Sequence, residues 1–346
     1  MTLRFGVIGT GAMAAAMMPA MRLSREVDVV AVASGNDARA RAFAETHGIR
    51  DVYGEAGVML REQTIDAVYI ANATGKHSET AIAALLAGKH VLCEKPFALT
   101  AVEGEKVLAA ARESGKLFME GLWTHFLPAY QRVHALVRDA AVGEPKHLTA
   151  AYGYPTTPEL RPRLFRRDDG GVLLDVAVYP ISLALRLLGP VADVTAIVTR
   201  NQERIDTDAA IQLRHENGGV SQLSASFDTL TSNTAVLSGR RGAVTIPAPV
   251  FGAEQVIVET AAPRGPADDA GASSKFKAAL KQVPILRKLK SALGGGEHHP
   301  YGRDQYLPQL THFLSLIAAG KTESDIASHA LSLDTLRVLD RIREQE

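Results

Sequence analysis

Residues 5–14 read Phe-Gly-Val-Ile-Gly-Thr-Gly-Ala-Met-Ala, an apolar run that passes through a glycine turn into a segment rich in alanine and methionine. An apolar run followed by Gly-x-Gly-x-x-Ala predicts a buried strand, a tight turn and the start of a helix, as in dinucleotide-binding units. Gly9 would form the turn, Gly11 would let the backbone approach a pyrophosphate, and Ala14 would let the helix pack close to the strand. A glycine pattern alone also fits an ordinary strand-to-helix turn. Because the first N–H groups of a helix favour phosphate, the expected cofactor-binding residues here are Gly9, Thr10, Gly11, Ala12 and Met13.

A second apolar strand is expected at residues 28–34, and it ends beside Gly35 and Arg39. NAD-binding units usually carry an acidic residue at this strand end to bind the ribose 2′-hydroxyl, but this chain has Ser34 there. A hydroxyl, an open glycine and a nearby arginine suit a 2′-phosphate better than a carboxylate would. We therefore expect Ser34, Gly35 and Arg39 to bind NADP, with NAD as the alternative cofactor. A solvated position for Arg39 on the following helix is equally compatible with the sequence.

Two more strands are expected at residues 65–71 and 89–93, with an alanine-rich helix between them. Strands that alternate with helices predict right-handed parallel crossovers, and ligands bind at the carboxyl ends of such strands. This half of the chain would therefore be α/β, with a doubly wound parallel Rossmann sheet. Lysine is usually a solvated surface residue, so a role for Lys95 needs support from other parts of the chain. The residues that follow the two strands are candidates for cofactor contacts: Ala71, Asn72, Ala73, His77, Glu94 and Lys95.

The composition favours a small-molecule partner. The chain has 346 residues, 46% of them hydrophobic, and its 38 Lys and Arg residues balance 38 Asp and Glu residues. A balanced charge creates no field that would attract nucleic acid or an acidic membrane surface. The single cysteine, Cys93, excludes an internal disulfide and fits a reducing cytoplasm. We expect no signal peptide and no membrane-spanning segment. No metal site is expected either, because no metal-ligand spacing connects His77, His125, His298 and His299.

The predicted pattern of alternating strands and helices ends after residue 122. From residue 191 onward, short strands follow one another through turns such as Asn217-Gly218-Gly219, which predicts a large, mostly antiparallel sheet. We expect a dinucleotide-binding Rossmann domain at residues 1–122 and an α+β domain for substrate binding and oligomerisation at residues 123–346. One face of its sheet would cover the site, and the other would pair with a second subunit in a homodimer or homotetramer.

Residues 263–300 break this pattern and are expected to be an insertion. The segment begins with Pro, Gly, Ala, Asp and Ser residues and then gives short basic amphipathic helices before Gly294-Gly295-Gly296. We expect a helical cover over the protein with its lysines in solvent, and contact with a membrane surface or an acidic partner is the alternative.

Four motifs together resemble the Gfo/Idh/MocA family of NAD(P)-dependent oxidoreductases, and the resemblance covers essentially the whole chain. They are the N-terminal glycine turn, the segment from Ile70 to His77, the triplet Glu94-Lys95-Pro96, and Gly170-Gly171-Val172-Leu173-Leu174-Asp175-x-x-x-Tyr179. Tyr179 stands where many members carry histidine, which is similar to the branch of dihydrodiol dehydrogenases, D-xylose dehydrogenases and anhydrofructose reductases. The segment Glu120-Gly121-Leu122-Trp123-Thr124-His125-Phe126-x-Pro128 also resembles that branch, although His125 replaces a common arginine. Asn72-Ala73-Thr74 departs from the usual Thr-Pro-Asn.

The resemblance implies hydride transfer between a nicotinamide and the carbinol or carbonyl carbon of a sugar, cyclic polyol or diol. This reaction needs a group that gives or takes the hydroxyl proton, and Lys95 can do so when burial and the positive charge of oxidised nicotinamide favour its neutral form. Asp175 could hold Lys95 by charge and Tyr179 could donate to the substrate oxygen, since residues four apart share one face of a helix. Pro180 complicates that helix, because proline fits only a first turn or a kink. The expected catalytic residues are Lys95, Asp175 and Tyr179, and the expected substrate-binding residues are Trp123, His125, Asp175 and Tyr179.

Other interpretations stay open at this point. Asp175 could be a helix cap and Tyr179 a core aromatic residue, while Glu94 would anchor a ribose or orient its turn. The resemblance also implies a cis peptide bond between Lys95 and Pro96. Two rival functions are a non-catalytic dinucleotide-binding sensor and a glycosidase that oxidises and re-reduces its sugar with bound NAD, a chemistry implied by the wider family. The intact set of Lys95, Asp175 and Tyr179 argues against the sensor.

Overall fold

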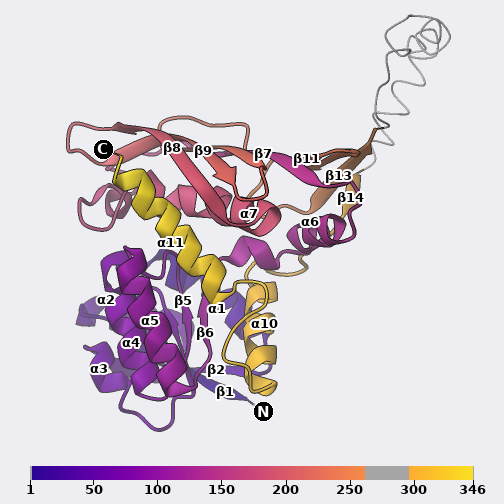
Figure 1. The fold of residues 1–346 in the computed structure, drawn as a ribbon. Coiled ribbons are helices and arrows are strands. Elements are labelled where there is room, and N and C mark those ends of the chain that lie inside the picture. The colour runs from indigo at the N-terminus through magenta and orange to yellow at the C-terminus, as the bar shows by residue number, and fades with distance from the viewer. Residues whose placement is uncertain (1, 262–295, 346) are drawn as a thin grey trace, which may run out of the picture.

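The computed structural model describes residues 2–261 and 296–345. Two sheets dominate this part of the chain, and Figure 1 shows them one above the other. The lower sheet has six parallel strands in the order β3-β2-β1-β4-β5-β6. The order reverses between β1 and β4, so the predicted doubly wound Rossmann sheet is confirmed. Its strands are β1 Leu3–Ile8, β2 Val27–Ala33, β3 Asp51–Tyr53, β4 Ala67–Ile70, β5 His90–Cys93 and β6 Phe118–Glu120.

Helices pack on both sides of the Rossmann sheet, which explains why its central strands are apolar almost throughout (Figure 1). Local signals fix where these helices begin. Asn36 accepts a hydrogen bond from Arg39 N at the start of α2, and Thr100 accepts one from Glu103 N at the start of α5. The helices of this half are α1 Ala12–Leu23, α2 Asp37–His47, α3 Ala56–Met59, α4 His77–Leu86 and α5 Ala101–Ser114, with a 3₁₀ turn at Thr74–Lys76.

The upper sheet has eight strands in the order β14-β13-β12-β11-β7-β10-β9-β8. All neighbours are antiparallel except β7 and β10, which confirms the mostly antiparallel sheet. The predicted insertion at 263–300, with its expected helical cover, lies largely outside the described residues, and its last described part includes β14. The strands are β7 Pro145–Gly153, β8 Val191–Arg200, β9 Asp206–His215, β10 Val220–Ser226, β11 Ala235–Gly239, β12 Gly242–Ile246, β13 Gln255–Thr260 and β14 Gly296–His298.

Five helical segments lie between the Rossmann sheet and the later strands of the upper sheet along the chain. They are the 3₁₀ turns Trp123–Phe126 and Pro162–Phe165, α6 Pro128–Arg138, the π-helix Leu173–Ala177, and α7 Val178–Leu188, which directly follows the π-helix. α7 packs against β7 and β10, and it therefore covers one face of the upper sheet. No helix in the described ranges has the length and apolar character that a membrane span requires.

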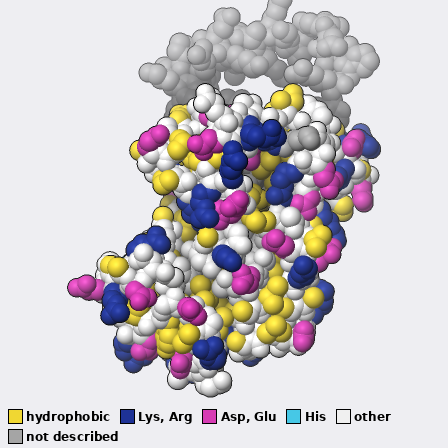
Figure 2. Space-filling model, turned by 90° about the vertical axis from the view of Figure 1, so that its left-hand side faces the viewer, with side chains coloured by type: hydrophobic (Ala, Val, Ile, Leu, Met, Phe, Trp, Pro, Cys, Tyr) yellow, Lys and Arg dark blue, Asp and Glu magenta, His cyan; other side chains and the backbone are white. Residues whose placement is uncertain are grey.

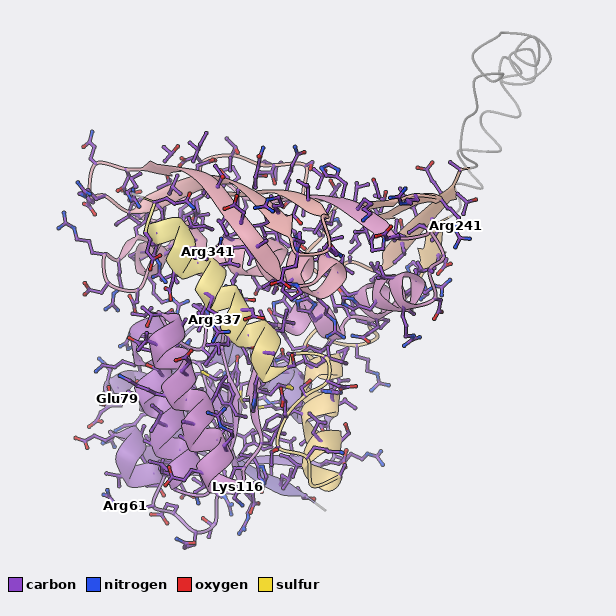
Figure 3. The ribbon with its side chains drawn as sticks, in the orientation of Figure 1. Arg61, Glu79, Lys116, Arg241, Arg337 and Arg341 are labelled. Carbon is purple, nitrogen blue, oxygen red and sulfur yellow. The ribbon has the colours of Figure 1, made fainter. Side chains whose placement is uncertain are left out.

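The last two helices, α10 Leu307–Ala318 and α11 His329–Arg343, return to the Rossmann half. Phe313 of α10 packs edge-on against Phe5 of β1, with 6.1 Å between the ring centroids. α11 crosses from one half to the other, and Arg337 and Arg341 project from it in Figure 3. Arg337 forms an ion pair of 3.0 Å with Glu105 of α5, and Arg341 donates to the β8 backbone. The C-terminal helix therefore joins the two halves.

Charged side chains of both signs share the surface of the described residues. Figure 2 shows Lys and Arg side chains beside Asp and Glu side chains over both halves of one face, with hydrophobic side chains between them. This mixture agrees with the balanced charge of the sequence, which has 38 Lys and Arg residues and 38 Asp and Glu residues. A surface of mixed sign offers no extended field to a polyanion on this face.

Candidate active site

A cavity of about 900 Å³ lies at the carboxyl ends of the parallel strands, between the glycine turn and the segment that precedes the π-helix. Gly9 has a φ of +109°, and a Cβ there would overlap the carbonyl of Ala71. Only glycine fits this position without strain. A Cβ on Gly11, in contrast, would meet nothing within 4 Å, and Gly11 lines the cavity. The backbone at Gly11 is therefore open to a close ligand, as a dinucleotide pyrophosphate requires.

Every residue expected to bind a cofactor lines either this cavity or the one next to it. Ser34 and Arg39 lie at the end formed by β2 and α2, where Ser34 Oγ accepts from Thr10 Oγ1 at 3.5 Å. Asp175 is the one carboxylate among the described residues that line the larger cavity, and it bonds to Lys95 after β5, which β1 and β4 separate from the β2 end at Ser34. The Ser34 end therefore suits a phosphate. The predicted residues of this cavity are Gly9, Thr10, Gly11, Ala12, Met13, Ser34, Gly35, Arg39, Ala71, Asn72 and Ala73.

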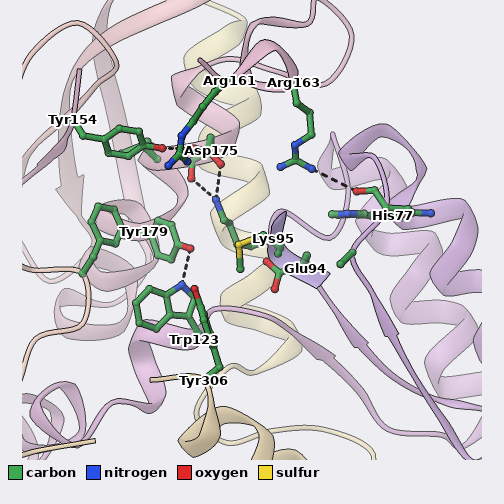
Figure 4. A pocket seen from close by; sticks show the side chains of 15 residues that line it. His77, Glu94, Lys95, Trp123, Tyr154, Arg161, Arg163, Asp175, Tyr179 and Tyr306 are labelled. Carbon is green, nitrogen blue, oxygen red and sulfur yellow. Dashed lines mark hydrogen bonds and ion pairs between the residues drawn. The ribbon is translucent and has the colours of Figure 1, made fainter. Parts of the chain in front are cut away.

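A second cavity of about 230 Å³ adjoins the first and contains the three residues predicted to be catalytic (Figure 4). Lys95 Nζ lies 2.9 Å from Asp175 Oδ1 and also donates to the Asp175 main-chain carbonyl. Tyr154 donates its hydroxyl to Asp175 Oδ2 at 3.0 Å. Burial alone would raise the pKa of Asp175, but the Lys95 charge and the two hydrogen bonds lower this pKa below its usual value. Asp175 is therefore a carboxylate that fixes the Lys95 ammonium.

The backbone at Asp175 explains why its carbonyl is available to Lys95. Asp175 lies in the π-helix, in which hydrogen bonds join residues five apart. In a π-helix the main-chain carbonyl of Asp175 would accept a hydrogen bond from the N–H of residue 180, but Pro180 has no N–H. Pro180 lies in the first turn of α7, where proline is tolerated. The predicted proximity of Asp175 and Tyr179 is thus present, with a π-helix in place of a regular α-helix.

Tyr179 is oriented by Trp123, whose Nε1–H donates to the Tyr179 hydroxyl oxygen at 2.9 Å. Because the oxygen accepts this bond, the tyrosine's own O–H remains free to donate into the cavity. Burial raises the pKa of Tyr179 well above its usual value, so the hydroxyl stays protonated. Lys95 Nζ lies 4.8 Å from the centre of the Tyr179 ring. The ammonium and the phenol therefore face the same small space.

Glu94 and His77 support the Lys95 turn. Glu94 Oε1 accepts from Tyr69 at 2.6 Å, and burial raises the pKa of Glu94. His77 Nδ1 donates to the carbonyl of Pro96 at 2.8 Å, and burial lowers the pKa of His77 to about 4, so the ring is neutral. The Lys95–Pro96 bond is cis, as the resemblance implied. Two buried oxygens beside the cavity, Glu94 Oε2 and Asn72 Oδ1, have no partner among the described residues and fit ribose hydroxyls.

His125 does not lie where a substrate-binding residue was expected. Its ring is fully buried, lines neither cavity, and bonds to Ser182 Oγ at 3.0 Å. Trp123 and His125 belong to one 3₁₀ turn, where three residues complete a turn, so residues two apart face different directions. Trp123 faces the cavity and His125 therefore faces the core.

Sequence reasoning missed several residues that line the smaller cavity. Tyr154, Arg161 and Arg163 come from the segment between β7 and the π-helix, to which the sequence motifs gave no functional role. Phe251 and Tyr306 come from loops far along the chain. The available signal was the Arg161-Pro162-Arg163 triplet, because two arginines around a proline in a loop suit anion binding. No cluster of three potential metal-binding side chains occurs in the described parts of the chain.

Two family models match the chain in succession. The model described as the oxidoreductase family with an NAD-binding Rossmann fold matches residues 3–122, and the model of the GFO/IDH/MocA C-terminal domain matches residues 130–245. These matches agree with the family that the sequence motifs resemble.

Relatives and solved structures carry related names. A trans-1,2-dihydrobenzene-1,2-diol dehydrogenase from Bos taurus is 28% identical over 263 residues, which cover 75% of this chain and 78% of the relative. A dTDP-3,4-didehydro-2,6-dideoxy-alpha-D-glucose 3-reductase from Streptomyces antibioticus is 34% identical over 243 residues, covering 69% and 74%. The crystal structure of a 3-ketoreductase from Actinomadura kijaniata with NADP and TDP-benzene matches with a TM-score of 0.80 and 25% identity, covering 99% of this chain and 98% of the other.

Proposed function

The chain belongs to the GFO/IDH/MocA oxidoreductase family, and from this membership we propose that it transfers a hydride between NADP and a carbinol or carbonyl carbon of a sugar, cyclic polyol or diol. The observation that carries the proposal is the placement of Lys95. Its ammonium lies just beyond the end of β5, meets Asp175 from the other half of the chain at 2.9 Å, and lies beside the Tyr179 ring. A hydride-transfer site needs such a proton-transfer group next to the cofactor.

The cofactor supplies or accepts the hydride, and the residues of this chain handle the proton and the oxygen. In the reductive direction, Lys95 donates a proton from its ammonium to the substrate oxygen as the C–O double bond becomes single. In the oxidative direction, the neutral amine takes the hydroxyl proton. Tyr179 donates a hydrogen bond to the same oxygen, which stabilises its developing negative charge. Asp175 holds Lys95 in place and remains ionised throughout.

NADP is the proposed cofactor, with NAD as the alternative. The Ser34 end of the larger cavity has Arg39 and no carboxylate among its described lining residues, which suits a 2′-phosphate. Gly11 leaves room for the pyrophosphate, and Glu94 Oε2 and Asn72 Oδ1 offer acceptors for ribose hydroxyls. The Actinomadura 3-ketoreductase structure contains NADP, which supports the same choice.

The test is a spectrophotometric assay of purified protein with NADP⁺ or NADPH and a panel of aldoses, ketoses, cyclic polyols and diols, with and without Lys95→Met. Wild-type turnover that falls by about 10² or more in the variant, while NADPH still binds, supports the proposal. Tight cofactor binding without turnover of any compound favours the sensor. Release of free sugar from a glycoside with cofactor retained favours the glycosidase.

We also propose the homodimer or homotetramer expected from the sequence. One face of β8 in the upper sheet carries the exposed, uncharged side chains of Thr195, Ile197 and Thr199, and Ile197 is 75% exposed. Pairing these uncharged side chains with a second copy of the same face would remove no charge of theirs from water. Size-exclusion chromatography with light scattering tests this, and an Ile197→Asp variant should shift the protein toward monomer.

A further inference from the structure

We infer that the substrate carries an anionic group, a carboxylate or a phosphate, and that Arg161 binds it. The inference rests on the proposed hydride transfer and narrows its substrate class. Arg161 lies in the segment between β7 and the π-helix and lines the smaller cavity at its junction with the larger one. A neutral polyol or diol has no negative charge that a guanidinium at this place would bind.

Arg161 contacts the tyrosine that binds the Lys95 partner Asp175. Its guanidinium carbon lies 5.4 Å from the centre of the Tyr154 ring, and Tyr154 donates to Asp175 Oδ2 at 3.0 Å. Asp175 in turn holds Lys95. Figure 4 shows Arg161 beside Tyr154 and Asp175, on the side of the cavity from which Asp175 meets Lys95. A ligand with its reacting oxygen at Lys95 would therefore extend toward Arg161.

Arg163 lines the same two cavities but makes different contacts. It lies beside the Rossmann half, where its Nη1 is 3.5 Å from the carbonyl oxygen of Asn72, and Figure 4 shows it far from Tyr154. Arg166 lines only the larger cavity and pairs with Asp169 at 3.1 Å. The contacts of these arginines therefore divide them, with Arg163 and Arg166 on the dinucleotide side and Arg161 on the substrate side.

The charges of the smaller cavity leave Arg161 without a counter-ion. Lys95 and Asp175 neutralise each other, and Glu94 is buried beside Tyr69. No ion pair joins Arg161 to a carboxylate of the described residues, and its ring contact with Tyr154 holds it in place without neutralising it. A planar guanidinium binds carboxylate or phosphate oxygens through two parallel hydrogen bonds. An oxyanion on the ligand would complete this arrangement.

The rest of the cavity sets the shape of such a ligand. Trp123, Tyr179, Phe251 and Tyr306 supply aromatic surface, and Trp123 and Tyr306 pack with 5.1 Å between ring centroids. Aromatic rings pack well against the apolar C–H face of a sugar ring. The ligand that satisfies both the charge and the aromatic surface is a sugar with a hydroxyl or keto group at Lys95 and an anionic group near Arg161. Uronic acids and sugar phosphates both have this form.

The experiment compares matched substrates that differ only in charge. Each set contains a neutral aldose, the corresponding uronic acid and the corresponding 6-phosphate, assayed with NADP⁺ and NADPH over a range of concentrations. We expect one anionic member to exceed the neutral member in kcat/KM. Arg161→Met should reduce this ratio by about 10- to 100-fold, because a hydrogen bond to a charged group is lost. Arg167→Met is the matched control, because Arg167 lies on the same segment and lines neither cavity, so it should preserve the ratio.

The outcomes separate the inference from the function on which it rests. Preference for the uronic acid or for the phosphate identifies the source of the oxyanion. Turnover of neutral sugars alone would overturn the inference and leave hydride transfer standing. Equal losses for charged and neutral members in Arg161→Met, together with a raised Kd for NADPH, would show that Arg161 serves the cofactor phosphates and would also overturn it. No turnover of any compound would refute both.

Discussion

Replacing Asp175 by asparagine tests whether the buried pair with Lys95 drives the proposed reaction. The substitution removes one charge and preserves the size of the side chain. The Lys95 and Asp175 side chains are only 8% and 19% exposed, so water screens their attraction little. The introduced amide would still offer one oxygen to Lys95. Its nitrogen would then face the Tyr154 hydroxyl, which donates in the wild-type protein and would have to become the acceptor for this bond to persist.

The expected loss follows from these two contacts. A hydrogen bond to a charged group contributes about 1.5–3 kcal/mol, compared with about 0.5–1.5 kcal/mol for a neutral one. Losing the charge at Lys95 and reversing or weakening the bond with Tyr154 should therefore cost about 1–3 kcal/mol, or roughly 5- to 150-fold in kcat/KM. The Kd of NADPH should change less, because Asp175 bonds to Lys95 and Tyr154, and two strands separate the β5 end at Lys95 from the β2 end at Ser34.

Steady-state kinetics with the preferred substrate measure the effect, and fluorescence quenching by NADPH measures cofactor binding. Tyr154→Phe is the control, because it removes one hydrogen bond and retains the carboxylate; its loss should be the smaller one, about 2- to 13-fold. The pKa of Asp175 is lowered in the folded protein, so its contribution to wild-type activity should be lost only when the pH drops through that low value. A D175N enzyme within twofold of wild type, or one more active than Y154F, would refute the reasoning.

Three further predictions concern the cofactor site, the Asp175 backbone and two buried histidines. Arg39→Leu should raise the Kd of NADPH by about tenfold and leave the Kd of NADH almost unchanged, because only NADPH carries the 2′-phosphate; equal changes in isothermal titration would contradict this. Pro180→Ala restores an N–H that competes with Lys95 for the Asp175 carbonyl, so kcat should fall by about 2- to 13-fold with little change in KM; an unchanged kcat would show that the carbonyl contact is dispensable. Burial lowers the pKa values of His77 and His125 to about 4 and about 3. Because the unfolded chain binds these protons first, their stabilisation is present above pH ~6.5 and is lost as the pH falls toward the folded values, by about 2 kcal/mol each at pH 5. Urea unfolding at pH 7.5 and 5.0 measures this, and equal stability at both values would be inconsistent with neutral buried rings.

The lining of the larger cavity was predictable because its signals are local. Each expected contact follows a strand by a few residues, and the parallel topology brings the carboxyl ends of those strands to one edge. The Gly-x-Gly spacing of Gly9 and Gly11 predicts a tight turn. A Cβ on Gly9 would overlap Ala71, which is the physical reason that glycine is needed there. Lys95 and Asp175 were brought together by the family resemblance, since no periodicity connects residues so far apart in the chain.

The lining of the smaller cavity was less predictable because many of its residues come from loops without periodicity. Tyr154 and Arg161 follow β7, whereas Phe251 and Tyr306 come from separate loops, and their meeting depends on how the two halves dock. His125 shows the opposite error. The sequence motif contains both His125 and Trp123, so both were expected to bind the substrate. In the structure they lie in one 3₁₀ turn, where residues two apart face different sides, and the sequence did not predict that turn.

We expect the distance between Lys95 and Asp175 to depend on α11, although no residue of this helix lines either cavity. Asp340 of α11 accepts from Ala101 N at 2.7 Å, at the start of α5 and a few residues after Lys95. Arg343 donates to the Leu99 carbonyl at 2.6 Å in the same stretch. Arg341 binds backbone carbonyls of β8, in the half that carries Asp175. Because one rigid helix fixes the chain after Lys95 and the edge of the upper sheet together, its packing sets the approach of ammonium and carboxylate. The geometry of the Lys95–Asp175 pair is therefore tied to contacts at the C-terminal helix, which lines neither cavity.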